Sequence, residues 1–200
     1  MTFAEMQDTL VLWLNREGFT TLVNQSEYLI AIGQRRIHRE CDLKAMEELI
    51  TPAISTNTLA APADLIRVKD ITLLHGYGNS EVLAAPVSEV MRDGVAGRPT
   101  TYTLIGTTLY FGPAPDQEYT AQLVYYKRLP ILSPANTTNW ISQNEPELLL
   151  FASLVEASLF LKDDARAQIW EARFQALKES LSASENRSDK PYGSLRVRTR

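Results

Sequence analysis

The amino-acid sequence predicts an α+β protein: a mainly α-helical bundle of about four helices, an inserted small antiparallel β module and an extended C-terminal arm. Three observations support this fold class. Apolar residues recur at helical spacing near both ends of the chain. Eight prolines punctuate the stretch between residues 51 and 140, and long helices cannot form at that spacing. The last seventeen residues lose the apolar periodicity and become basic.

The N-terminal fifty residues predict two helices. Thr2 and Glu5 match a capping box, because the threonine hydroxyl can accept from the Glu5 amide while the carboxylate reaches back. Apolar residues then follow at steps of three and four, and Gly18 suits the end of this helix. A second helix is expected from about Leu22 to Leu43.

The middle of the chain predicts short strands. Residues 65–74 form a β-rich run, and residues 102–105 and 109–111 flank Gly106, which suits a hairpin turn. In residues 119–128, apolar and aromatic side chains alternate with polar ones, as on a half-buried strand.

Two further helices are expected after Trp140. Residues 148–161 are apolar nearly all round, which indicates a buried helix. Asp163 suits the N-cap of the last helix, in which Trp170 and Phe174 belong to the apolar stripe. We therefore expect one domain over residues 1–183, with helices in 1–50 and 145–183 and a β-rich insertion at 51–140. Residues 184–200 form the basic arm.

The arm differs from the rest of the chain in charge. Residues 184–200 carry a net charge of +3 while the whole chain carries −4, so residues 1–183 carry −7. Its end alternates apolar side chains or threonine with arginine, a pattern that suits a strand added to another protein's sheet. We expect the arm to bind a partner protein, and its candidate contact residues are Tyr192, Leu195, Arg196, Val197, Arg198 and Arg200.

Composition excludes several classes of protein. No apolar run approaches the roughly 20 residues that cross a bilayer, and the N-terminus lacks the basic start of a signal peptide. A single cysteine excludes an internal disulfide, and a sequence pI of about 5.3 argues against nucleic-acid binding by the body. We expect synthesis in a cytoplasm.

Candidate catalytic groups are few, and no cofactor or metal site is predicted. His38 and Cys41 lie three residues apart on a predicted helix, but a metal site needs further ligands. Three carboxylate pairs, Glu47/Glu48, Glu145/Glu147 and Asp163/Asp164, fit solvated or capping positions better than a glycosidase pair. The tyrosines of the β module, Tyr125 among them, fit cross-strand packing better than a stacking platform. We therefore expect no enzyme.

A series of segments between Ala60 and Lys178 resembles the head-to-tail adaptor (connector) proteins of tailed bacteriophages, especially the short-tailed-phage type. The resemblance rests on the order and spacing of turn and packing signatures rather than on catalytic motifs. The segments are Leu59–Leu65, Pro86–Val90, Gly97–Tyr102, Gly106–Leu109, Pro113–Pro115, Leu123–Pro130, Asn139–Ile141, Pro146–Leu154, Asp163–Arg166 and Trp170–Phe174.

The resemblance implies a structural protein of the virion neck. In such proteins a ring of about twelve copies lies below the portal vertex, extends the DNA channel and offers a platform for the tail. The implied partners are the portal protein, tail, nozzle or tail-fibre proteins and further copies of the chain, with genomic DNA passing through without sequence-specific binding. The alternative hypotheses are another neck protein (stopper or tail completion) and, less favoured, a small polymer hydrolase or a carbohydrate-binding module.

Overall fold

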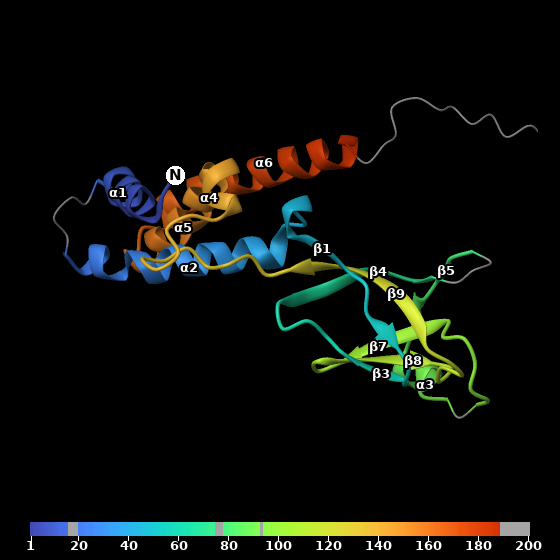
Figure 1. Cartoon of the computed structure of the whole chain (residues 1–200). Helices are drawn as coiled ribbons and strands as arrows, with labels where there is room; N and C mark the ends of the chain where they lie inside the picture. The colour runs from blue at the N-terminus through green and yellow to red at the C-terminus, as the bar shows by residue number, and fades with distance from the viewer. Residues whose placement is uncertain (16–19, 75–77, 93, 189–200) are drawn as a thin grey trace, which may run out of the picture. The chain divides into compact units, whose positions relative to one another are not determined.

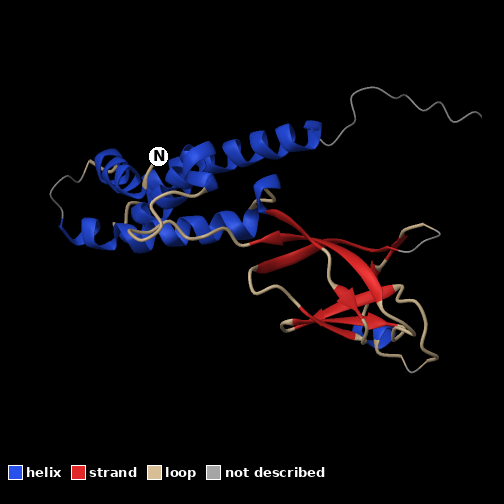
Figure 2. Cartoon of the chain, in the orientation of Figure 1, coloured by secondary structure: helices blue, strands red, loops and turns tan. Residues whose placement is uncertain are grey.

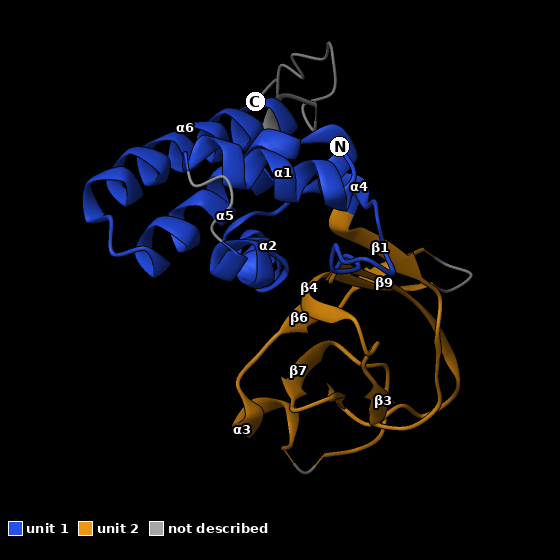
Figure 3. Cartoon of the chain, turned by 90° about the vertical axis from the view of Figure 1, so that its left-hand side faces the viewer, with its two compact units in different colours: residues 1–45, 129–200 blue, residues 46–128 orange. Residues whose placement is uncertain are grey.

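A computed structural model describes residues 1–15, 20–74, 78–92 and 94–188. Along this part of the chain two helices come first, then six strands, a short helix, three more strands and three helices (Figures 1 and 2). It divides into two compact units (Figure 3), a helical one of residues 1–45 and 129–200 and a β-rich one of residues 46–128. Each unit is built around its own buried side chains.

The helical unit contains five α-helices within the described residues. They are α1 (Phe3–Trp13), α2 (Thr20–Glu40), α4 (Trp140–Asn144), α5 (Pro146–Phe160) and α6 (Asp164–Ser188). A 3-10 turn, η1 (Lys44–Met46), follows α2 at the boundary of the two units. Helix α5 packs against both α2 and α6. Ten of its fifteen residues are buried, as its nearly continuous apolar sequence predicts.

The ends of these helices follow the local sequence. The Thr2–Glu5 capping box at the start of α1 is confirmed, with the Glu5 amide 3.3 Å from the Thr2 hydroxyl and the Thr2 amide 2.8 Å from the Glu5 carboxylate. Asp163 caps α6 by accepting from the amide of Arg166 at 3.1 Å, also as predicted. Gly18 lies outside the described residues.

The β-rich unit holds two sheets and the short helix α3 (Val87–Val90). In the first sheet β1 (Glu47–Ile50), β9 (Tyr119–Lys127), β4 (Leu65–Leu74) and β5 (Ser80–Glu81) are neighbours in this order, and β2 (Ala53–Ile54) also pairs with β9. The second sheet has the order β3 (Thr58–Ala60), β8 (Thr108–Gly112), β7 (Thr101–Ile105) and β6 (Leu83–Ala84).

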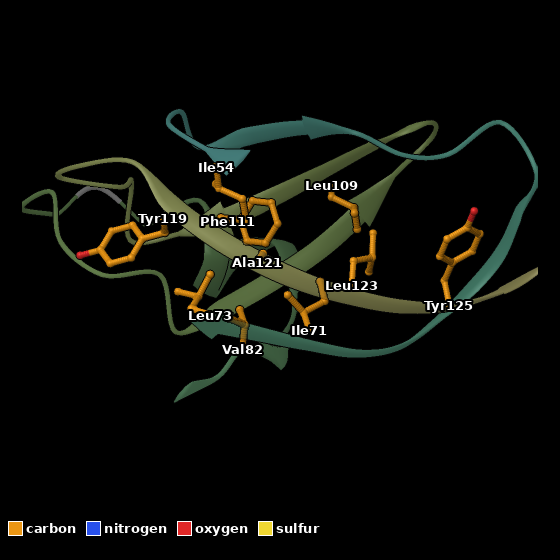
Figure 4. Packing of buried hydrophobic residues seen from close by; sticks show 10 residues of the cluster. All are labelled: Ile54, Ile71, Leu73, Val82, Leu109, Phe111, Tyr119, Ala121, Leu123 and Tyr125. Carbon is orange, nitrogen blue, oxygen red and sulfur yellow. The ribbon is translucent and has the colours of Figure 1, made fainter. Parts of the chain in front are cut away.

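One apolar core joins the two sheets. Strands β4 and β9 pair antiparallel over their lengths, with Ile71 opposite Leu123 and Leu73 opposite Ala121. Their inward side chains meet residues of β8 and β2 (Figure 4). Tyr119, Ala121, Leu123 and Tyr125 are all buried, so the predicted alternation along this strand is confirmed.

The prediction of a mainly helical protein with about four helices is wrong. The described residues form six α-helices and nine strands, and the β-rich unit consists of two sheets rather than one small antiparallel module. One pair, β6 with β7, is parallel. The underestimate has a physical cause: five of the strands are only two to four residues long, too short to show a period of two.

Candidate assembly surfaces

His38 near the end of α2 and Cys41 just after the helix are placed for packing. Cys41 and His38 are both buried, and burial raises the pKa of the Cys41 thiol to about 11. A thiol with this pKa stays protonated near neutral pH and is a poor nucleophile. Among the described residues no three histidine, cysteine or acidic side chains come together as a metal site. His75 lies outside the described residues.

Three of the paired carboxylates, Glu47, Glu48 and Asp163, form ion pairs with basic side chains. Glu47 and Glu48 are adjacent on β1, so they point to opposite faces of the sheet. Glu47 pairs with Lys69 at 2.6 Å and Glu48 with Lys127 at 2.5 Å. Asp163 pairs with Arg166 at 3.3 Å in addition to capping α6.

Two tyrosines of the β module belong to its core. Tyr119 and Tyr125 are buried, and the Tyr125 hydroxyl donates to Asp64 at 3.1 Å. Burial, with this hydrogen bond, raises the pKa of Tyr125 to about 12. Rings buried in this way cannot stack on a sugar or a base, which agrees with the packing interpretation.

The structure does not describe the predicted contact residues of the arm. Tyr192, Leu195, Arg196, Val197, Arg198 and Arg200 all lie outside the described residues. Helix α6 continues through Ser188, so residues 184–188 of the predicted arm are helical and the remaining twelve residues follow the end of α6.

A charged network fixes α6 to α2. Arg36 lies 2.8 Å from Glu40 and 2.6 Å from Glu171, and its guanidinium stacks 4.5 Å above the Phe174 ring. Lys178 lies 3.3 Å from Glu40. The hydrogen bond from Arg36 lowers the pKa of Glu171, so its contribution to stability is lost as the pH falls through that lowered pKa.

A fully buried glutamine holds the chain that returns from the β-rich unit. The Gln34 amide donates to the carbonyl of Pro130 at 2.8 Å, and its oxygen accepts from the Leu132 amide at 2.9 Å. The same oxygen accepts from Asn139 Nδ2 at 3.0 Å. These bonds fix the segment that leads into α4 and α5.

Three aromatic rings lock α1, α5 and α6 together. Trp170 stacks on Phe151 with ring centroids 5.9 Å apart, and Trp13 lies 5.7 Å from Trp170 and 5.8 Å from Phe151. Sequence periodicity predicts Trp170 as an apolar contact of the last helix, and the structure confirms this contact.

Trp170→Ala should lower the free energy of unfolding by about 3 kcal/mol, because it removes a large ring from this cluster. Urea unfolding followed by far-UV circular dichroism measures the change. Trp140→Ala is the matched control and should cost clearly less, since Trp140 is more exposed and belongs to no described ring pair. Equal losses would show that the ring cluster adds nothing.

The outward face of α6 is unusually apolar. Ile169, Ala172 and Ala176 follow at steps of three and four, on the side opposite the buried Phe174. Together with Arg173 and Leu177 they line a shallow groove of about 570 Å³. Ile169 is 56% exposed. The sequence alone does not reveal this face, because alanine is a good helix former on any side of a helix.

A second apolar surface lies in the β-rich unit, on the segment that joins β6 to β7. Its exposed side chains are Val87, Met91 and Val95. Leu83 of β6, which precedes this segment in the sequence, is exposed as well. Val90 and Met91 help line a hollow of about 350 Å³ next to β8. Large exposed apolar side chains of this kind are typical of protein contacts.

Comparison with known proteins identifies the family. No helix in the described part of the chain is long and apolar enough to span a membrane. No curated protein matches the sequence. The family model of the SU10 adaptor protein matches residues 1–198, which include both units and nearly all of the arm. The chain therefore belongs to the SU10 adaptor protein family, a family of phage head-to-tail adaptors, which are structural proteins of the virion neck that contact other head and tail proteins.

Proposed function

We propose that this protein docks below the portal vertex as a closed ring of about twelve copies, extends the DNA channel and provides the platform for tail, nozzle or tail-fibre proteins. The family match over residues 1–198 carries the proposal. The role requires no enzymatic step, and synthesis takes place in the cytoplasm of the bacterial host.

In this proposal the arm binds the portal protein. Arginines can pair with portal carboxylates, while the alternating apolar positions suit an added strand. About twelve arms on one ring gain avidity even where a single arm binds weakly. The proposed contact residues are Tyr192, Leu195, Arg196, Val197, Arg198 and Arg200.

The charge of the body suits a DNA channel. Residues 1–183 carry −7, and an acidic channel wall repels phosphates, so that the genome slides through without sequence-specific binding.

Quantitative mass spectrometry of purified virions tests the proposal. The ratio of this protein to the portal protein should be about one, because both form rings of the same symmetry. A phage protein that acts only inside the infected cell would be absent from virions or present in traces. Absence of this protein from virions would therefore contradict the proposed function.

A further inference from the structure

We propose that the apolar groove of α6 takes helix α2 of a neighbouring copy, and that this contact closes the ring. The inference rests on the proposed function and specifies which two faces of the helical unit meet. A ring with more than two copies needs a head-to-tail contact, in which two different faces of each chain fit one another. The outward faces of α6 and α2 differ in shape and in charge.

The α6 face offers a shallow groove lined by two alanines together with Ile169, Arg173 and Leu177. Ala172 and Ala176 leave room for a larger group, and the exposed Ile169 supplies apolar area at one end. Glu179 lies seven residues beyond Ala172 and therefore on the same side of the helix. Within the described residues Glu179 is exposed and forms no ion pair.

The α2 face carries the complementary groups. Tyr28 is 58% exposed, Ile32 is half-buried, and Arg35 lies seven residues beyond Tyr28 on the same side. Arg35 is exposed and has no ion-pair partner among the described residues. A large ring and a cation on α2 thus match a shallow groove and an anion on α6.

The two faces have the same spacing. Tyr28 to Arg35 and Ala172 to Glu179 are both seven residues, or about 10.5 Å of helix. If the two helices run parallel, Tyr28 fills the groove at Ala172, Ile32 lies against Ala176, and Arg35 meets Glu179. The pairing of Arg35 with Glu179 then fixes the register.

The parallel direction follows from the arrangement inside one chain. Two ion pairs join the helices: Arg36 of α2 contacts Glu171 of α6, and Glu40 contacts Lys178. From the first pair to the second the residue number rises on both helices, so α2 and α6 run parallel (Figure 1). Copies in a ring of about twelve differ by a rotation of about 30°. Such a small rotation keeps α2 of one copy close to parallel with α6 of the next.

Disulfide trapping tests the contact in the full chain. The variant Tyr28→Cys/Ala172→Cys, assembled on the portal protein of the same phage and oxidised, should give a ladder of covalent multimers. Unintended disulfides through the native cysteine should be rare, because Cys41 is buried and its thiol is protonated. The matched control is Tyr28→Cys/Ser184→Cys, in which the second cysteine lies about 18 Å farther along α6, beyond the reach of a disulfide.

Charge reversal provides the second readout. Arg35→Glu or Glu179→Arg alone should lower the yield of rings on the portal about tenfold, because each places like charges in contact. The double variant Arg35→Glu/Glu179→Arg restores opposite charges and should recover the rings. Both positions are exposed, so the fold should be unaffected.

The outcomes separate this inference from the proposed function. Rings that form on the portal without a disulfide ladder, and with no effect of charge reversal, would overturn the α6–α2 contact and leave the proposed function standing. A chain that never associates with the portal would overturn both.

Discussion

Removal of residues 189–200 should leave a folded protein that no longer docks on the portal. The fold should survive because the last described contact of α6, between Glu185 and the Lys44 amide at 3.0 Å, precedes the deletion. Portal affinity should fall at least about a hundredfold, because the loss of every arm on a ring removes their combined avidity. Binding of the purified chain to immobilised portal protein measures the change.

Two full-length variants distinguish the contribution of the positive charge of the arm from that of the arginine side-chain geometry. Replacement of Arg196, Arg198 and Arg200 by glutamine should abolish docking as the deletion does, whereas replacement by lysine should retain part of it. Normal docking of the truncated protein would show that the portal contact lies on the body rather than on the arm.

Gly33→Ala should destabilise the helical unit by about 3 kcal/mol, because α2 and α5 cross in close contact at this position. A Cβ atom on Gly33 would lie 2.7 Å from the Ser153 hydroxyl and 2.8 Å from the Ser153 backbone nitrogen. The hydroxyl could move, but the backbone of a buried helix could not. The helices would have to separate.

Urea unfolding followed by tryptophan fluorescence measures this effect in the helical unit alone, since Trp13, Trp140 and Trp170 all belong to it. Adding Ser153→Ala should recover little stability, because the backbone nitrogen remains in the way. Asn24→Ala on the same helix is the control and should be nearly neutral, since Asn24 is exposed. A Gly33→Ala variant as stable as the original would show that the crossing is looser than described.

The features that could be predicted from the sequence are those whose signal lies within a single helix or strand. The Thr2–Glu5 capping box, the apolar run of α5 and the alternation along β9 each lie within one element, and each is confirmed. The balance of helix and strand was misjudged because β2, β5 and β6 are only two residues long. Such strands exist only through the pairing of distant segments.

The buried polar contacts could not be predicted because they are non-local. Gln34 is polar and lies on a helix that otherwise reads as amphipathic, yet its partners are 96 to 105 residues away in the sequence. The groove on α6 was overlooked for a different reason. Alanine is a good helix former on any face, so Ala172 and Ala176 carry no sign of exposure until the fold shows which side of α6 is buried.

The mass of the complex between this protein and the portal protein of its own phage tests the central claim most directly. Native mass spectrometry or mass photometry of the mixture should give one defined assembly, with one copy of the chain for each portal subunit, about twelve in all. A chain that remains monomeric in the presence of the portal would contradict the account and direct attention to other proteins of the virion neck.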